Sequence, residues 1–265
     1  MGEAIVITSG KGGVGKTTTT ANLGTALALQ GKKVCLVDTD IGLRNLDVIL
    51  GLENRIIYDL VDVIKGRCKI PQALVKDKRF ENGLFLLPAA QTTDKSAVNP
   101  EQMKTLITEL KRDYDYVLID CPAGIEQGYK NAVAGADRAI VVTTPEISAV
   151  RDADRIIGLL EQEDIEPPKL IINRIRRQLM ASGNALDVND ITTHLSIDLL
   201  GIILDDENVI SSSNKGEPVV MDPSKLAAIG YRNIARRILG ESVPLMSLNT
   251  SKIGLFGKIK SIFEK

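Results

Sequence analysis

Seven short apolar runs recur along the chain and predict seven buried strands. They are rich in Val and Ile and lack the polar alternation of a strand with one face in water. The runs are residues 4–8, 33–38, 84–89, 116–120, 138–144, 169–173 and 199–204. Because both faces of such strands must be covered, we expect them to form a mostly parallel sheet inside the molecule.

The stretches between these runs predict helices at 16–30, 100–113, 125–134, 148–163 and 223–239. Pro100 follows Asn99 and Pro223 follows Asp222, which is the arrangement of a capping residue before the first helical turn. Alternating strands and helices predict an α/β fold, namely a mostly parallel, doubly wound sheet with helices on both faces. Ligands of such sheets bind beyond the carboxyl ends of the strands, so functional residues should follow the apolar runs.

Composition narrows the class of protein without identifying it. The chain has 265 residues, 44% of them apolar, and a net charge of -1, so no global attraction to nucleic acid or an anionic surface is expected. Cys35, Cys68 and Cys121 are far apart and form no CxxC, which favours reduced thiols in a cytosolic protein. We expect no cleavable targeting peptide before the first strand and no membrane span. Residues 1–245 are predicted to form one domain, followed at 246–265 by a flexible linker and a C-terminal amphipathic helix.

A phosphate-binding loop is the clearest motif. "GKGGVGKT", residues 10–17, matches G-x-x-x-x-G-K-[ST] between a predicted strand and a predicted helix. Lys16 is expected to reach the β- and γ-phosphates and Thr17 to hold Mg²⁺. The alternative is a glycine-rich turn without a ligand. The predicted nucleotide-binding residues of this loop are Gly10, Lys11, Gly12, Gly13, Val14, Gly15, Lys16, Thr17 and Thr18.

Carboxylates follow two other strands. Asp38 and Asp40 are two residues apart, so on an extended segment they would point the same way, one toward Mg²⁺ and one toward an attacking water. Asp120 ends a strand, where a Walker B carboxylate is expected, and the Pro-Ala-Gly turn after it can sense the γ-phosphate. The alternative for each aspartate is the capping of a loop turn.

Lys11 is a second lysine in the loop, and the motif around it resembles that of a known family. "KGGVGKTT" resembles the deviant Walker A motif of the ATPase family that includes MinD, the plasmid and chromosome partition ATPases and nitrogenase iron protein. The resemblance implies that Lys11 crosses a dimer interface to the partner's phosphates, so that ATP and homodimer formation are coupled. It implies Lys11, Lys16 and Asp40 as catalytic residues, with Asp40 on the hydrolytic water, and Thr17, Asp38 and Asp120 as the Mg²⁺ shell. The alternative for Lys11 is a solvated loop lysine.

The base-binding site is predicted at the end of another strand. Asn173 offers a donor and an acceptor, which suit the N6/N1 edge of adenine. The resemblance implies an Asn173–Arg174 pair and a second loop with Asp206, although Leu204 stands where many relatives have proline. Since no NKxD motif is visible, ATP is favoured over GTP. The alternative for Asn173 is a turn residue.

The end of the chain predicts a membrane anchor. In "SKIGLFGKIKSIFEK", residues 251–265, five apolar side chains fall within roughly 120° of a helical wheel and lysines flank them. A basic amphipathic helix of this kind suits an anionic phospholipid surface, and two tails on one ATP-bound dimer would bind far more strongly than one. The alternative is a terminal helix docked on the protein's own core. The predicted membrane residues are Ile253, Leu255, Phe256, Lys258, Ile259, Lys260, Ile262 and Phe263.

Four longer segments resemble the MinD branch of the family: residues 42–64, 120–137, 143–161 and 214–220. The resemblance implies attachment to the inner face of the plasma membrane and ATP-dependent recruitment of the division inhibitor MinC, which controls placement of the septum. It also implies a second regulator, either MinE-like or a polar scaffold. Arg151, Asp152 and Asp154 are candidate partner contacts, and the alternative for them is an ordinary charged helix face.

Other functions remain open at this point. A DNA-partition ATPase of the same fold would need a basic surface, for which the last predicted helix offers Lys225, Arg232, Arg236 and Arg237. The amphipathic tail argues against it, and no specific nucleic acid is expected as a partner. A nitrogenase-type electron donor would need cysteines for an iron–sulfur cluster, whereas Cys121 lies in the turn beside Asp120. A small-molecule kinase would need an acceptor pocket that the sequence does not reveal.

Overall fold

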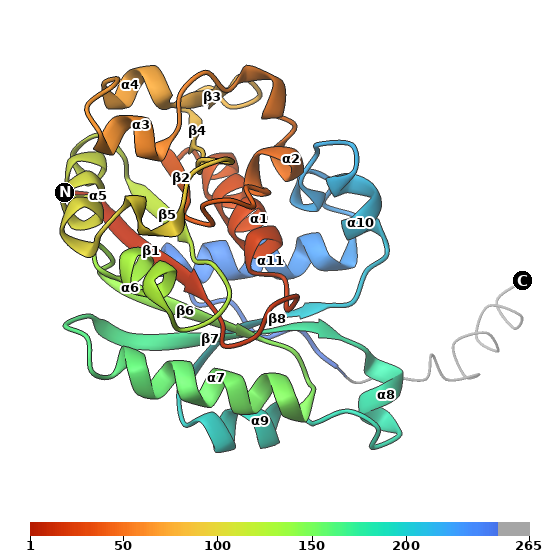
Figure 1. Cartoon of the computed structure of the whole chain (residues 1–265). Helices are drawn as coiled ribbons and strands as arrows, with labels where there is room; N and C mark the ends of the chain where they lie inside the picture. The colour runs from red at the N-terminus through yellow and green to blue at the C-terminus, as the bar shows by residue number, and fades with distance from the viewer. Residues whose placement is uncertain (249–265) are drawn as a thin grey trace, which may run out of the picture.

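The computed structural model describes residues 1–248 (Figure 1). The eight predicted membrane residues, Ile253 to Phe263, lie outside this part of the chain. Within residues 1–248, no helix combines the length and the apolar character that crossing a bilayer requires.

Eight strands form one sheet in the order β3-β4-β2-β5-β1-β6-β7-β8, and the seven predicted strands are all present (Figure 1). The missed strand is the short edge strand β3, which pairs antiparallel with β4, whereas the other pairings are parallel. Three residues are too few to show a periodic pattern. The strands are β1 (Glu3–Thr8), β2 (Val34–Asp38), β3 (Val75–Asp77), β4 (Leu84–Leu87), β5 (Tyr116–Asp120), β6 (Arg138–Thr143), β7 (Glu166–Ile175) and β8 (Asp198–Leu204).

The five predicted helices are also present, with small shifts at their ends. They are α1 (Lys16–Leu29), α5 (Pro100–Asp113), α6 (Gln127–Val133), α7 (Ile147–Leu160) and α11 (Leu226–Ile238). Within residues 1–248, six further α-helices were missed because each has at most eight residues, too few for a helical period to stand out. These are α2 (Leu46–Leu50), α3 (Leu60–Ile64), α4 (Ile70–Ala73), α8 (Arg177–Ala181), α9 (Val188–Leu195) and α10 (Asn208–Ser213).

One predicted helix start is confirmed and the other is wrong. Asn99 caps α5, its side chain accepting a hydrogen bond from the backbone N–H of Gln102. The last helix begins at Leu226 rather than at Pro223. Asp222 does not cap it, because Asp222 Oδ1 accepts hydrogen bonds from the backbone N–H and the hydroxyl of Ser224 in a separate turn. The expected capping signal therefore belongs to a tight turn before the helix.

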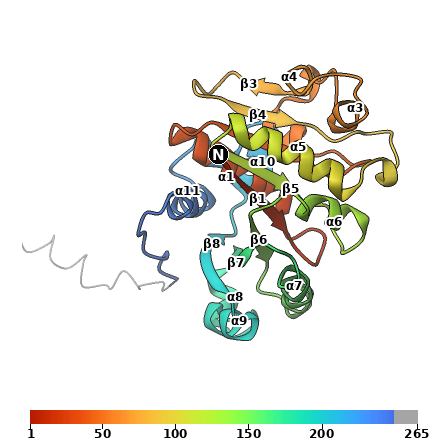
Figure 2. The same cartoon turned by 90° about the vertical axis from the view of Figure 1, so that its left-hand side faces the viewer.

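Apolar side chains cover both faces of the sheet, as the doubly wound prediction required. Alternate residues of β1 point to opposite sides: Val6 belongs to one buried cluster and Ile7 to the other. Helices α5, α6, α7 and α9 pack on the first face, and α1, α2 and α11 pack on the second. Figure 2 shows α11 and α7 on opposite sides of the sheet. This arrangement leaves the loops after the strands at one end of the molecule.

Candidate functional site

The phosphate loop links β1 to α1 and is shaped for a bound anion. Gly15 stands before the helix with φ of 97°, a left-handed conformation that favours glycine. Without a side chain there, no cap occupies the first N–H groups of α1, and these groups carry the positive end of the helix dipole. Lys16 is buried, and its ammonium group donates to Ser9 Oγ at 3.0 Å. The loop thus offers backbone N–H groups and one buried cation to a phosphate.

Close packing from two directions holds this loop. Asn173 Nδ2 at the end of β7 donates to the carbonyl oxygen of Val14 at 2.8 Å. A Cβ atom at Gly15 would lie 2.5 Å from the same nitrogen, and one at Gly10 would collide with the backbone of Asp152 in α7. Only glycine fits at these two positions, because β7 and α7 press directly on the loop backbone.

Asn173 therefore has a role that the sequence did not predict. Its amide supports the phosphate loop, and its Oδ1 accepts from the backbone N–H of Arg174, an exposed residue with a φ of 55°. A non-glycine residue with this φ is uncommon. The turn-residue alternative is partly right, since the bond to Arg174 is local. The reading of adenine by Asn173 and Arg174 stays a prediction.

Two buried carboxylates lie side by side below the loop. Asp38 and Asp120 are paired neighbours on the parallel strands β2 and β5, and they are 1% and 2% exposed. Thr20 Oγ1 donates to Asp120 at 3.2 Å. Burial, followed by the charge of Asp38, raises the pKa of Asp120 to about 8 despite hydrogen bonds from Thr17 and Thr20 and the nearby Lys16. Burial likewise raises the pKa of Asp38, to about 6. Two buried carboxylates so close together favour the binding of a cation beside them.

The residues present fit Mg²⁺. This ion prefers oxygen ligands and is typically held by one or two carboxylates together with water and substrate phosphates. The hydroxyl of Thr17 bonds to Asp120, so the predicted set of Thr17, Asp38 and Asp120 lies together beside the phosphate loop. A cation there would also favour the ionised form of both carboxylates, whose pKa values burial raises.

The expected common direction of Asp38 and Asp40 rested on a wrong premise, because β2 ends at Asp38. The chain turns at once: the backbone N–H of Asp40 donates to Asp38 Oδ1 at 3.0 Å. Asp38 Oδ2 accepts from the backbone N–H groups of Asn45 and Leu46 at the start of α2. The turn-capping alternative is therefore also true of Asp38, whose carboxylate ties the Asp40 loop to the sheet. Asp40 itself is half-buried in that loop.

Lys11 leaves its own loop and lies on the first turn of α7. Its Nζ donates to Ser148 Oγ at 2.8 Å and lies 3.4 Å from Glu146 Oε2. Its side chain is 38% exposed, so it is not simply solvated, as the alternative had it. Glu146 and Ser148 were missed because they follow Lys11 by 135 and 137 residues and no local pattern connects them. Lys16 therefore points into the phosphate loop, whereas Lys11 points to the start of α7.

The predicted partner residues lie on the same helix. Arg151 and Asp154 are exposed on α7, while Asp152 is half-buried and its backbone faces Gly10 of the phosphate loop. One helix therefore contacts the nucleotide loop, holds Lys11 and carries the candidate partner contacts. Whether these residues bind a partner stays a prediction.

Asp206 lies in the loop after β8, where both of its carboxylate oxygens are used inside the chain. Oδ1 accepts from Asn208 Nδ2 at 2.6 Å, and Oδ2 accepts from the backbone N–H of Ala227 at the start of α11. Burial opposes its ionisation, but the hydrogen bonds from Asn208, Ala227 and Leu226 outweigh it and lower the pKa of Asp206. Asp206 therefore caps a helix, and its contact with a base stays a prediction.

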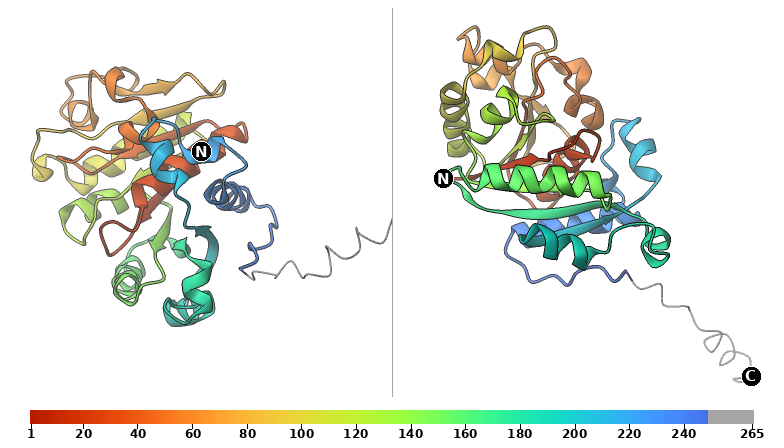
Figure 3. Two further views of the ribbon diagram at one scale, coloured as in Figure 1. Left: turned by 90° about the vertical axis from the view of Figure 1, so that its right-hand side faces the viewer. Right: turned by 60° about the horizontal axis from the view of Figure 1, so that its bottom comes forward.

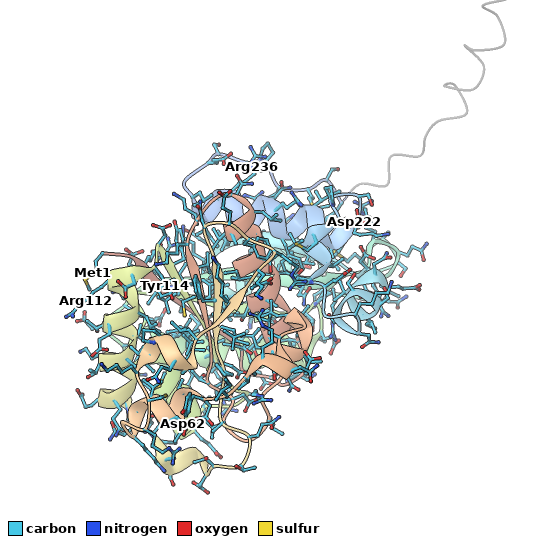
Figure 4. The ribbon with its side chains drawn as sticks, turned by 90° about the horizontal axis from the view of Figure 1, so that it is seen from above. Met1, Asp62, Arg112, Tyr114, Asp222 and Arg236 are labelled. Atoms are coloured by element: carbon cyan, nitrogen blue, oxygen red, sulfur yellow. The ribbon has the colours of Figure 1, made fainter. Side chains whose placement is uncertain are left out.

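The basic residues in and next to α11 that a DNA-partition function would need contact carboxylates and carbonyl groups of this same chain. Lys225 lies 3.6 Å from Asp222 and Arg236 lies 2.7 Å from Glu241, at the two ends of α11 (Figure 4). Arg232 donates to the carbonyl of Val220, and Arg237 donates to three carbonyls. These four residues do not form a patch of unpaired cations, so the observation disfavours DNA binding.

The other two alternatives also find no support. Cys35 and Cys121 are buried as free thiols, so they are not presented for a cluster shared between subunits. A cavity of about 820 Å³ is lined by Lys33, Phe85 and Tyr114 among others. Lys33 and Tyr114 precede β2 and β5, so this cavity lies at the end of the sheet opposite the phosphate loop, near the N-terminus and Arg112 (Figure 4). An acceptor bound there would be too far from the γ-phosphate for a kinase.

Comparison with known proteins agrees with this geometry. The family described as the CobQ/CobB/MinD/ParA nucleotide binding domain matches residues 5–219. The septum site-determining protein MinD of Bacillus subtilis is 73% identical over 264 residues, covering 99% of this chain and 98% of the relative.

Two solved structures are similar over almost their whole length. A MinC:MinD cell division protein complex from Aquifex aeolicus has a MinD chain that is 51% identical, with a TM-score of 0.85, covering 92% of this chain and 98% of that one. The septum site-determining protein MinD from Pyrococcus horikoshii, complexed with Mg-ADP, is 33% identical, with a TM-score of 0.81, covering 90% and 96%. With the phosphate loop and the buried carboxylate pair in place, the chain belongs to the CobQ/CobB/MinD/ParA nucleotide-binding family and, within it, to the MinD septum site-determining proteins.

Proposed function

We propose that the chain is a Mg²⁺-dependent ATPase that dimerises with ATP and binds the inner face of the plasma membrane through its predicted amphipathic helix, residues 251–265. On the membrane it recruits a MinC-type division inhibitor and so controls where the septum forms. The observation that carries this proposal is the separation of the two loop lysines. Lys16 points into its own phosphate loop at Ser9, whereas Lys11 lies 2.8 Å from Ser148 on α7.

The direction of Lys11 supports a role toward a second copy. Its ammonium group lies at the edge of the site, on an exposed helix start, and can reach a phosphate of the partner subunit once it leaves Ser148 and Glu146. Exposed apolar side chains on the same end of the sheet support an interface there. Leu43, Ile125 and Ile147 are 64%, 41% and 62% exposed. Leu43 and Ile125 lie in the loops after Asp40 and Asp120, and Ile147 lies between the two residues that Lys11 contacts.

The chemistry follows from the groups around the loop. Bound Mg²⁺, held by Thr17, Asp38 and Asp120, would neutralise charge that develops on the phosphate oxygens. Lys16 and the α1 N–H groups hold the phosphates, and Lys11 of the partner adds a cation, as an arginine finger does. Asp40 orients the attacking water from its loop, which Asp38 ties to the sheet through the backbone N–H of Asp40. Closure of the dimer excludes other water from the site.

Membrane attachment and partner binding complete the cycle. The apolar face of residues 253–263 inserts into an anionic phospholipid surface, and two tails on one dimer make binding cooperative. The relative from Aquifex aeolicus is found in a MinC:MinD complex, which supports a MinC-type partner for this chain. Arg151, Asp152 and Asp154 on α7 are the proposed contacts, and a MinE-like protein or polar scaffold is the proposed regulator. ATP hydrolysis separates the dimer and releases the membrane.

Sedimentation with phosphatidylglycerol-containing vesicles tests the proposal, with ATP, ADP or no nucleotide. We expect the wild type to sediment only with ATP, Asp40→Ala to remain on the vesicles because hydrolysis is blocked, and Lys11→Ala to stay in solution. Lys104→Ala, which removes an exposed lysine of α5, serves as the control and should behave as wild type. Equal sedimentation of Lys11→Ala and wild type would contradict the proposal.

A further inference from the structure

Arg237 makes an unusual set of contacts near the end of α11. Its guanidinium donates three hydrogen bonds to backbone carbonyl oxygens: Nη1 to Leu200 of β8 at 2.9 Å, Nε to Val243 at 2.9 Å and Nη2 to Pro244 at 2.8 Å. Burial lowers the pKa of this side chain, which is half-buried between β8 and the segment after α11. One arginine thus joins the edge strand of the sheet to the segment that follows the last helix.

This segment, residues 240–248, runs back along the edge of the sheet, and we refer to it as the strap. α11 ends at Ile238, and Gly240 reverses the chain with a φ of 87°, its N–H bonded to the carbonyl of Arg237. At its other end the carbonyl of Ser247 accepts from Arg177 of α8 at 3.3 Å. Because α8 follows the carboxyl end of β7, the strap carries the chain from one end of the sheet to the other (Figure 3).

The strap also passes from one face of the sheet to the other. α11 packs on the face of α1, whereas the half-buried side chains of Met246 and Leu248 pack on the cluster that includes α9. It therefore wraps around β8, the last strand of the sheet. Pro244 has no N–H to donate to a neighbouring strand, which suits an edge covered by side-chain hydrogen bonds rather than by a ninth strand.

We propose that Arg237 is a positioning residue for membrane attachment. By clamping the strap, it helps to hold Leu248 at the nucleotide end of the sheet, where two copies would meet. Without the clamp the strap would be held only at its far end, by Arg177 and by the packing of Met246 and Leu248, and complete release would leave the chain anchored at Ile238. Ile238 lies near Leu200, which is about 13 Å further from that end than Leu204 at roughly 3.3 Å per residue. This inference rests on the proposed function of the tail as the anchor.

The size of the effect has an upper limit, which is set by complete release of the strap. Leu248 lies five residues before Ile253 in the sequence, whereas Ile238 lies fifteen residues before it. Since effective concentration falls roughly as the −3/2 power of the length of a flexible connection, a threefold longer connection weakens the pairing of two tails by at most about fivefold. ATP binding should not change, because Arg237 contacts Leu200 near the start of β8, whereas the phosphate loop follows the carboxyl end of β1 at the other end of the sheet.

Vesicle binding of the full chain tests this inference. With ATP and phosphatidylglycerol vesicles, Arg237→Ala should need more protein for half-maximal sedimentation, by a factor of up to about five, while its ATP affinity in solution stays that of the wild type. Arg237→Lys, which can donate to fewer carbonyls in this geometry, should lie between the two. Arg112→Ala, an exposed arginine at the end of α5, is the matched control and should bind as wild type.

Two further measurements keep the inference testable if Arg237→Ala folds poorly. Met246→Ser with Leu248→Ser loosens the strap without touching α11 and should give the same weakened binding. A nitroxide label at Ser247→Cys, in a Cys68→Ser background, should give a narrow distance distribution in dimers with a non-hydrolysable ATP analogue, and a broad one once Arg237 is replaced.

The outcomes distinguish the proposed function of the protein from the positioning role of Arg237. If the wild type does not sediment with ATP, the proposed function fails, whereas the label distances still test the strap without any membrane. If the wild type sediments but the clamp variants match it, with an equally narrow distance distribution, the positioning role of Arg237 is overturned.

Discussion

The ammonium group of Lys11 lies 2.8 Å from the hydroxyl of Ser148, which is 137 residues further along the chain. The same ammonium is 3.4 Å from the carboxylate of Glu146, so the start of α7 receives a cation from the phosphate loop. A lysine held in this way cannot reach the phosphates of another subunit until it leaves α7. The contact therefore opposes the dimer that we propose, and its strength can be measured.

Removing the acidic partner of Lys11 should favour dimerisation. In Glu146→Gln the ammonium loses its ion pair, and because that pair is exposed its contribution is at most about 1 kcal/mol. Because both subunits lose the pair, we expect ATP-dependent dimerisation to occur at up to about 25-fold lower protein concentration, with little change in thermal stability. Analytical ultracentrifugation with a non-hydrolysable ATP analogue measures this shift. Glu161→Gln, at the other end of α7, is the control, and weaker dimerisation of Glu146→Gln would show that Glu146 acts in the dimer itself.

Replacing Lys16 should abolish most nucleotide binding while leaving the fold intact. Its ammonium is buried beside Ser9, and charge-assisted hydrogen bonds contribute about 1.5–3 kcal/mol each. Lys16→Ala should therefore lower the affinity for ADP by roughly 10- to 100-fold, as measured by isothermal titration calorimetry. An unchanged ADP affinity in a folded Lys16→Ala protein would argue that phosphates bind elsewhere.

Binding of Mg²⁺ should release protons at neutral pH. The folded protein raises the pKa of Asp120 to about 8, well above the ordinary carboxyl value near 4, so at pH 7 the nucleotide-free site holds a proton that the cation must displace. Apparent Mg²⁺ affinity should rise between pH 6 and 8. Calorimetry in two buffers of different ionisation enthalpy measures the release, and Asp120→Asn should remove it.

The same pKa shift predicts how stability depends on pH without ligands. Between the unfolded value near 4 and the folded value of about 8, the folded state binds more protons than the unfolded state. Stability from this group is therefore present at low pH and is lost as pH rises through that window. Urea denaturation of Asp120→Asn and wild type should show a smaller loss in the variant, and equal slopes would contradict the shift.

Asn173 offers a test that separates two roles. If it mainly supports the phosphate loop, Asn173→Leu leaves the carbonyl of Val14 without its partner and costs about 1–3 kcal/mol of stability. Affinity for ATP and GTP should then fall together. If Asn173 reads adenine, the preference for ATP over GTP should shrink in the variant. Thermal denaturation together with competition between the two nucleotides distinguishes these results.

Some features of this protein were determined by local sequence. The apolar runs produced seven of the eight strands, because a strand buried on both faces must be apolar throughout. The phosphate loop could also be predicted from the sequence, because a left-handed position such as Gly15 favours glycine and the phosphate-binding Lys16 must follow it directly. The short helices and β3 could not be predicted, because three to eight residues are too few to show a clear period.

Other features were decided only by the tertiary structure. The order of the strands places Asp38 beside Asp120, Asn173 against Val14, and Ser148 beside Lys11, although each pair is far apart in the chain. The strap depends in the same way on Arg237 reaching Leu200. Sequence determines which residues are buried or turn the chain, since burial and backbone conformation act over a few neighbours. Which loops meet is set by sheet order, and that order follows from packing both faces of the whole sheet at once.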